Sequence, residues 1–273
     1  MTALGIGSAM DYIDGNKKAW EEAFEHRKPN WGEDHADRLV SENLPFFNQD
    51  TIAVLKSLDL QAKTIAQFGC NNGRELLSAM QLEAAYGIGF DIAENFIGQA
   101  RQIAEKIGRK NVEFVTGNLL EIDETYHERF DLIFFTIGAI TWFEDLNLLF
   151  DMVSKCLKPN GTLLINDFHP FMNMLPLPGE EGYDPRHLNR VVFSYFRKAP
   201  WLENNGIGYI TPEYHSRTFT SFSHTLSSIF NALIGSGIAI KKFDEFDYDL
   251  GLSEDYDGIG FPLSFILIGE KII

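Results

Sequence analysis

The alternation of strand-like and helix-like segments between Lys63 and Asp167 limits most strongly how this chain can fold. Short apolar runs alternate with longer segments in which apolar residues recur every three or four positions, as on one face of a helix. Such alternation predicts a parallel sheet with helices on both of its faces. The expected strands are residues 64–68, 86–90, 112–115, 130–135 and 162–167.

A different pattern follows Asp167. Residues 168–223 are rich in Pro, Tyr and Phe and have no clear period, which predicts an insertion with irregular or antiparallel structure. A helix is expected over residues 225–234, and two strands over 238–246 and 261–268. These strands are too close in sequence for a helical crossover, so we expect them to be antiparallel. The prediction is an α/β fold, with a doubly wound seven-stranded sheet and an antiparallel C-terminal strand pair.

Helix-like segments precede the first strand and predict an N-terminal helical cap. Asn16 is expected to cap a helix through Trp20 and Phe24, a second helix should include Leu39, and a third should follow Asp50. The predicted organisation is a helical cap over residues 1–60, a core over 61–170, an insertion over 171–223, and a C-terminal helix and strands over 224–273 that complete the core.

The charge and the cysteine content restrict the partners and the surroundings of the protein. Lys and Arg number 23 against 39 Asp and Glu, a formal net charge of −16, which disfavours nucleic acid as a general partner. Cys70 and Cys156 have no spacing typical of a disulfide framework or a zinc site, so no metal is expected. No signal peptide and no membrane-spanning run is recognisable. We expect a soluble cytoplasmic protein that is a monomer or homodimer and has no membrane association.

Two elements at strand ends indicate a nucleoside-containing ligand. The first expected strand runs into Gln-Phe-Gly-Cys-Asn-Asn-Gly, residues 67–73, where Gly69 permits a sharp turn and Gly73 lets the next helix begin close to the strand. This brings main chain and a helix start against the ligand. The second strand ends at Asp91, whose carboxylate can accept hydrogen bonds from both hydroxyl groups of a ribose.

Together with three further motifs, this region resembles the class I S-adenosylmethionine-dependent methyltransferases. The further motifs are Thr-Gly-Asn-Leu at 116–119, Phe-Asp-Leu-Ile at 130–133 and Lys-Pro-Asn-Gly at 158–161. The resemblance is clearest over residues 63–170. It implies that a Rossmann-like core over 61–170 binds S-adenosyl-L-methionine and leaves S-adenosyl-L-homocysteine as the product. The insertion would then be a substrate cap.

The resemblance also assigns roles to individual residues. Asp91 would bind the ribose, Ile92 would pack on the adenine, and Asn118 would bond the adenine amino group. Leu119 would supply a backbone amide, and Thr136 and Ile137 would line the methionine end. The full set of expected cofactor-binding residues is Gln67, Gly69, Cys70, Asn71, Gly73, Asp91, Ile92, Asn118, Leu119, Thr136 and Ile137.

Three positions depart from the usual pattern of that family. Gln67 stands where the family usually has an acid, so this side chain can accept a hydrogen bond from the cofactor's ammonium group but brings no charge. Asn71 stands in place of a glycine, and asparagine tolerates a positive φ better than most residues. Asn118 replaces a frequent aspartate. Glycine turns of this type are similar to those of an atypical bacterial branch, which residues 140–143 and 167–170 also resemble.

Catalytic residues are less constrained, because methyl transfer needs alignment and only sometimes a general base. His169 follows the fifth expected strand and His224 precedes the helix over 225–234, so both are candidate bases or substrate ligands; each could instead be a hydrogen-bonded structural residue. The expected acceptor is a small molecule. Two alternatives remain open. One is a non-catalytic or repurposed S-adenosylmethionine-binding protein, and the other is an NAD(P)-dependent oxidoreductase, which would be expected to carry the absent Gly-x-Gly-x-x-Gly turn.

Overall fold

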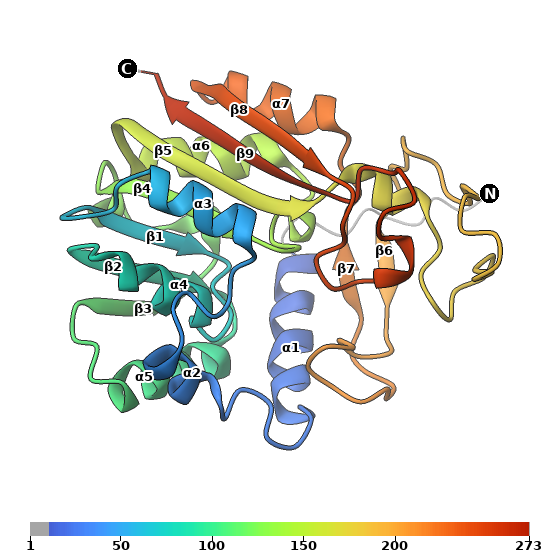
Figure 1. Ribbon diagram of the computed structural model, residues 1–273, viewed down its shortest axis with the longest axis horizontal. Coiled ribbons are helices and arrows are strands. Elements are labelled where there is room, and N and C mark those ends of the chain that lie inside the picture. The colour runs from blue at the N-terminus through green and yellow to red at the C-terminus, as the bar shows by residue number, and fades with distance from the viewer. Residues whose placement is uncertain (1–10, 273) are drawn as a thin grey trace.

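A seven-stranded mixed sheet forms the centre of the protein in the computed structural model, which describes residues 11–272 (Figure 1). The strand order is β3-β2-β1-β4-β5-β9-β8, and β9 runs antiparallel to both β5 and β8, which confirms the predicted fold class. The order reverses between β1 and β4, where open α/β sheets bind their ligands. The strands are β1 (Thr64–Phe68), β2 (Tyr86–Asp91), β3 (Val112–Thr116), β4 (Phe130–Thr136), β5 (Leu157–Phe168), β8 (Ile238–Phe246) and β9 (Ser264–Lys271).

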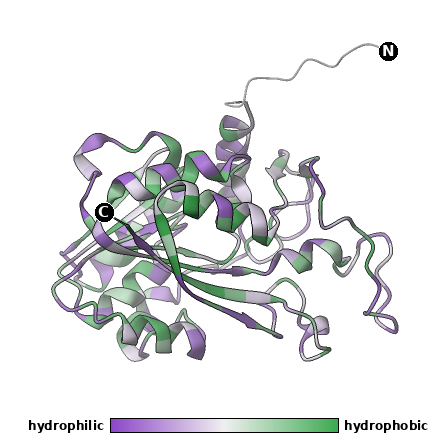
Figure 2. Cartoon of the chain, turned by 90° about the horizontal axis from the view of Figure 1, so that it is seen from above, coloured by the Kyte–Doolittle hydropathy of each residue, from purple (hydrophilic) through white to green (hydrophobic). Residues whose placement is uncertain are grey.

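Helices cover both faces of the sheet because the central strands are apolar on both sides. In β4, Leu132 and Phe134 pack in one core cluster, and Ile133 and Phe135 pack in the other. Hydrophobic residues follow the strands and the inner sides of the helices, whereas hydrophilic residues mark the outer sides (Figure 2). The first cluster includes α2 (His35–Ser41), α3 (Gln49–Ser57), α4 (Arg74–Ala79) and α5 (Glu94–Lys106); the second includes α6 (Leu146–Cys156) and α7 (Leu226–Gly235).

Short 3₁₀ helices follow several strands. The 3₁₀ helices that come directly after β3, β4 and β5 lie at the edge of the sheet where the parallel strands end, so they help to shape the surface that faces a ligand there. The described 3₁₀ helices are η1 (Met80–Leu82), η2 (Leu119–Glu121), η3 (Glu124–Tyr126), η4 (Ile140–Trp142), η5 (Pro170–Met174) and η6 (Glu254–Tyr256).

Helix α1 (Asp11–Glu25) shows that the expected capping role of Asn16 is wrong. The helix is already formed at Asp11, and Asn16 lies within it. The buried Asn16 side chain instead bonds the backbone of Thr220, donating to its carbonyl at 2.8 Å and accepting from its N–H at 2.7 Å. The cap of α3 is likewise Asn48, which accepts from the N–H of Thr51, and not Asp50.

The insertion forms a roof together with α1. Its strands β6 (Trp201–Glu203) and β7 (Phe219–Ser221) pair as a small antiparallel sheet. Helix α1 stands at the carboxyl ends of the parallel strands, between them and this small sheet (Figure 1). The N–H of Lys28, just after α1, donates to the carbonyl of Ile210 at 2.8 Å. Within the described residues, no helix is long and apolar enough to cross a membrane.

Candidate cofactor and acceptor site

A cavity of about 1010 Å³ lies between the carboxyl ends of the parallel strands and the roof formed by α1 and the insertion. Its wall includes the turns that follow β1, β2, β3, β4 and β5, so segments far apart in sequence meet around one space. Most of the expected cofactor-binding residues line it, namely Gly69, Asn71, Asp91, Ile92, Asn118, Leu119, Thr136 and Ile137.

The turn after β1 has an unusual backbone that its sequence allows. Gly69, Asn71 and Gly73 have φ values of 71°, 50° and 73°, in the left-handed region. Asn71 therefore adopts the conformation that the sequence predicted it could tolerate. A Cβ atom on Gly73 would lie 2.4 Å from Cε1 of Phe114, so only glycine lets α4 begin this close to the sheet.

Asp91 joins the end of β2 to this turn. Its Oδ2 accepts a hydrogen bond from the N–H of Asn71 at 2.8 Å, and its Oδ1 accepts one from the N–H of Ala93 at 3.0 Å. Burial raises the pKa of Asp91, and the bonds from Ala93 and Asn71 act in the opposite direction. Each carboxylate oxygen has a further acceptor position, so Asp91 can fix the turn and still bind a ligand in the cavity.

Three expected cofactor residues, Gln67, Cys70 and Gly73, lie behind the cavity wall. Gln67 is 1% exposed, and its Nε2 donates to Oγ1 of Thr136 at 2.9 Å. The Oε1 of Gln67 is buried without a hydrogen-bond partner among residues 11–272. Cys70 is fully buried, which raises the pKa of its thiol well above the usual value. Cys70 and Gly73 can influence a ligand only through the turn, whereas Gln67 lies directly beside Thr136 of the cavity wall.

Asn118 caps the short helix η2 and also faces the cavity. Its Oδ1 accepts a hydrogen bond from the N–H of Leu120 at 3.0 Å. An amide oxygen can accept a second bond, and the amide nitrogen has two donors. Asn118 can therefore bond a heterocycle edge without giving up its capping role.

The structure brings His224, but not His169, to the cavity. The Nε2 of His224 lies 2.9 Å from the carbonyl of Phe143, to which it must donate, so the neutral ring has its lone pair on Nδ1. Burial lowers the pKa of His224, opposed by the carbonyls of Phe143 and Ile140.

His169 is 5% exposed and is held within the protein. Its Nδ1 accepts from the N–H of Phe171 at 3.0 Å, and its Nε2 lies 3.0 Å from Oε1 of Glu245. Burial lowers the pKa of His169, and Glu245 opposes that shift. Since both ring nitrogens already face protein atoms, this placement favours a structural role for His169.

Sequence reasoning missed the acidic character of the cavity. Its wall holds one arginine, no lysine and five carboxylate side chains, so it suits a neutral or cationic ligand better than an anionic one. The carboxylates come from separate elements, and no short motif could have revealed them together. They are Glu75, Asp91, Asp167, Glu180 and Glu203.

Asp167, at the end of β5, is the most buried acid in this set. It is 3% exposed, and burial raises its pKa to about 6. Its Oδ1 accepts from the N–H groups of Gly138 and Phe168 at 2.5 and 2.8 Å. Asp167 therefore holds the loop after β4 in place. Its position at a strand end is the signal that could have marked it in the sequence.

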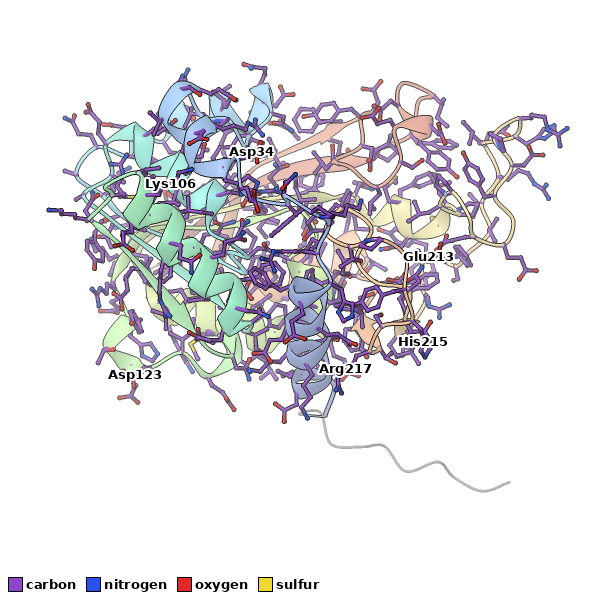
Figure 3. The ribbon with its side chains drawn as sticks, turned by 90° about the horizontal axis from the view of Figure 1, so that it is seen from below. Asp34, Lys106, Asp123, Glu213, His215 and Arg217 are labelled. Atoms are coloured by element: carbon purple, nitrogen blue, oxygen red, sulfur yellow. The ribbon has the colours of Figure 1, made fainter. Side chains whose placement is uncertain are left out.

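Aromatic side chains from the roof close the far side of the cavity. Trp20 of α1 packs edge-on against Trp142 and Phe219, with ring centroids 5.2 and 5.4 Å apart. Trp201 and Phe193 of the insertion also line the space. By contrast, Glu213, His215 and Arg217 lie on the insertion segment beside α1 (Figure 3), and none of these three lines the cavity.

A smaller cavity of about 210 Å³ adjoins the large one. Glu75, Thr136, Ile137 and Leu250 line both spaces, so the two meet beside the turn after β4. The remainder of the smaller wall comes from the segment before α3, from Asn166 of β5 and from the loop after β8, including Asn48 and Tyr248.

Sequence comparison finds a curated methyltransferase that is similar to part of this chain. A ribosomal protein L11 methyltransferase from Vibrio campbellii is 31% identical over 112 residues, which are 41% of this chain and 36% of that protein. The chain thus matches only about a third of the length of that relative.

Two solved structures share the fold. An S-adenosylmethionine dependent methyltransferase from Mesorhizobium loti has a TM-score of 0.55 at 19% identity, covering 85% of this chain and 99% of that one. Geranyl diphosphate C-methyltransferase from Streptomyces coelicolor A3(2), solved in complex with S-adenosyl-L-homocysteine, has a TM-score of 0.60 at 12% identity, covering 98% of this chain and 100% of that one. The model of the methyltransferase domain family matches residues 60–198, about half of the chain, and the chain belongs to this family.

Proposed function

We propose that this protein transfers a methyl group from S-adenosyl-L-methionine to a small acceptor bound beneath the insertion. The observation that carries the proposal is the single cavity of about 1010 Å³. Its wall joins the turns after β1 to β4, on the cofactor side, to Trp201 and Glu203 of the insertion. One continuous space can therefore hold the two reacting molecules next to each other.

The residues around the sheet edge fit this cofactor. Asp91 would accept from the ribose hydroxyls, Asn118 and the Leu119 amide would meet the adenine edge, and Ile92 would pack on its face. The cofactor carries a sulfonium and so has a net positive charge, which the acidic wall complements. A nicotinamide dinucleotide would place a pyrophosphate in the same acidic surroundings. The charge of the cavity thus argues against the oxidoreductase alternative.

The bound cofactor would supply an electrophilic methyl group, whose bond to sulfur breaks as the acceptor atom bonds to carbon and the electron pair stays on sulfur. The protein's part is to align the acceptor and exclude water, and alignment alone can contribute up to about 7–11 kcal/mol. The walls formed by Trp142, Trp201 and Phe222 would do this. Where the acceptor loses a proton, neutral His224 would take it on Nδ1, typically a gain of about 10²–10⁴-fold.

The acidic wall and the roof over the cavity support a small acceptor that is neutral or cationic. The L11 methyltransferase relative leaves a protein acceptor as the alternative, although its similarity covers only part of each chain. Cys70 and Cys156 are both free and buried, which supports our further proposal that the protein works in the reducing cytoplasm.

Calorimetry with S-adenosyl-L-methionine, S-adenosyl-L-homocysteine and NAD⁺ tests the cofactor. We expect the first two to bind and NAD⁺ not to bind; binding of NAD⁺ alone would overturn the proposal. Transfer of a labelled methyl group should then be followed on small amines and phenols, on small phosphate and carboxylate compounds, and on purified L11. Labelling of amines or phenols supports the proposed acceptor. Labelling of only L11 or only the anionic compounds would refute it.

The role of His224 can be separated from that of His169 once an acceptor is known. His224→Gln should lower kcat and remove the acid limb of its pH profile while leaving cofactor affinity unchanged. His169→Gln, the matched change outside the cavity wall, should keep that limb. If His224→Gln retains the wild-type pH profile, His224 is not the base.

A further inference from the structure

The first turn of α4 places an acid at the methionine end of the cavity. Glu75 is 6% exposed, yet it lines both the large and the small cavity. Thr136 and Ile137, which the family resemblance assigns to the methionine end, line both cavities with it. The carboxylate is therefore buried from bulk solvent and borders the space where the amino-acid part of the cofactor belongs.

Arg74, the residue before Glu75, pairs with this acid. The Nε of Arg74 donates to Oε1 of Glu75 at 2.8 Å, and the Arg74 side chain also packs against the ring of Phe46, with its guanidinium carbon 5.6 Å from the ring centroid. This pair holds Glu75 in one orientation and offsets part of the cost of burying its charge. The bond uses Oε1 and leaves Oε2 for a ligand.

The usual acid of the family is absent at this end. Gln67 occupies that position with a neutral amide, and its Nε2 bonds Oγ1 of Thr136 at 2.9 Å. Glu75 and this Thr136 line the same two cavities. The methionine end thus keeps a negative charge, but from a helix residue rather than from the strand.

We propose that Glu75 replaces the missing acid and binds the ammonium group of the cofactor's amino-acid part. This inference rests on the proposed function. An ammonium group that leaves water needs a charged or multiple hydrogen-bonding partner, and Glu75 is the carboxylate that borders Thr136 in both cavities. The buried Oε1 of Gln67, beside Thr136, is a further acceptor at the same end.

The test compares two ligands that differ in the amino-acid part. S-Adenosyl-L-homocysteine carries it, and 5′-methylthioadenosine keeps the nucleoside and thioether without it. In Glu75→Gln, calorimetry should show the Kd of S-adenosyl-L-homocysteine rising about 10- to 100-fold, because a charge-assisted bond is lost. The Kd of 5′-methylthioadenosine should change by less than about twofold. Glu213→Gln, the same chemical change at an exposed site outside the cavity wall, should leave both values unaltered.

A second variant tests the role of Glu75 if Glu75→Gln folds poorly. Gln67→Glu/Glu75→Gln returns a carboxylate to the strand position and should recover most of the affinity for S-adenosyl-L-homocysteine. Unchanged affinity in Glu75→Gln, equal losses for both ligands, or no recovery in the double variant would overturn the assignment. If wild-type protein binds neither S-adenosyl-L-methionine nor S-adenosyl-L-homocysteine, the proposed function itself fails.

Discussion

The Nδ2 atom of Asn72 donates a hydrogen bond to Nδ1 of His35 across 3.2 Å, and this contact ties the turn after β1 to helix α2. Asn72 is 1% exposed and also donates to Oε1 of Gln99 at 3.1 Å. An amide nitrogen can only donate, so Nδ1 of His35 must carry a lone pair and the ring must be neutral. Burial, aided by the positive charge of Arg74, lowers the pKa of His35 to about 4.

This neutral histidine predicts acid sensitivity of the folded state. Between about pH 4 and pH 6.5 the unfolded chain protonates His35 but the folded chain does not, so the free energy of unfolding should rise with pH in this window. His35 should add a slope of up to about 1.4 kcal/mol per pH unit to the free energy of unfolding. This stabilisation is fully present above about pH 6.5 and is lost as the pH falls toward about 4. Urea denaturation across this range should show a shallower rise for His35→Gln. Equal slopes in the two proteins would contradict the prediction.

Replacing Asp91 should weaken the binding of every ligand that contains the ribose. In Asp91→Asn the charge that accepts from the hydroxyls is lost, and each such bond contributes about 1.5–3 kcal/mol. We expect both S-adenosyl-L-homocysteine and 5′-methylthioadenosine to bind at least about tenfold more weakly, in contrast to the selective effect expected for Glu75→Gln. Calorimetry measures both. Unchanged affinity for 5′-methylthioadenosine would refute the ribose assignment.

Gly73 should be intolerant of any side chain. Gly73→Ala combines a φ of 73° with a Cβ atom 2.4 Å from the Phe114 ring, so we expect a loss of stability of about 1–3 kcal/mol. Gly98→Ala is the matched control, because nothing lies within 4 Å of its added Cβ within helix α5. That change should stabilise by about 0.5–1 kcal/mol. Thermal or urea unfolding measures the stability of both variants. Similar stabilities for Gly73→Ala and Gly98→Ala would show that the contact with Phe114 is easily relieved.

The fold was predictable because the period of the apolar residues reports burial directly. β1 and β8 match their expected ranges, and the other expected strands appear in the right order. The largest difference is β5, which begins at Leu157 instead of residue 162. The turn residue Asn160 has a φ of 60°, yet Leu157 already pairs with Phe130 before the register shift. Pairing with a neighbouring strand extended β5 through a sequence that by itself favours a turn.

The site was only partly predictable, because tertiary neighbours decide the roles of single side chains. Gly69 and Asp91 sit at strand ends, where the fold alone directs them toward the cavity. The roles of the two histidines could not be decided from sequence, because His169, the N-cap of η5, contacts Glu245 on the remote strand β8. The position of Glu75 in the cavity wall likewise depends on how α4 packs against β2 and α2.

The hydrogen bonds between Asn16 and Thr220 should stabilise the packing of α1 against the insertion. Asn16 lines the cavity, and its amide makes two hydrogen bonds to the backbone of Thr220, which join α1 to β7. Asn16→Ala would leave a buried N–H and carbonyl without these partners, at a cost of about 1–3 kcal/mol for each group that stays unsatisfied.

Hydrogen exchange measures the effect directly. In Asn16→Ala the amide of Thr220 should exchange faster, because opening of the roof becomes easier, while the amides of β1 and β4 in the central sheet should keep their protection. Asn16→Asp keeps the acceptor for the Thr220 N–H and loses only the donor to the Thr220 carbonyl. In this variant the Thr220 amide should exchange at a rate between those of the wild-type protein and Asn16→Ala. If exchange at Thr220 is unchanged in Asn16→Ala, other contacts such as that of Trp20 with Phe219 hold the roof in place.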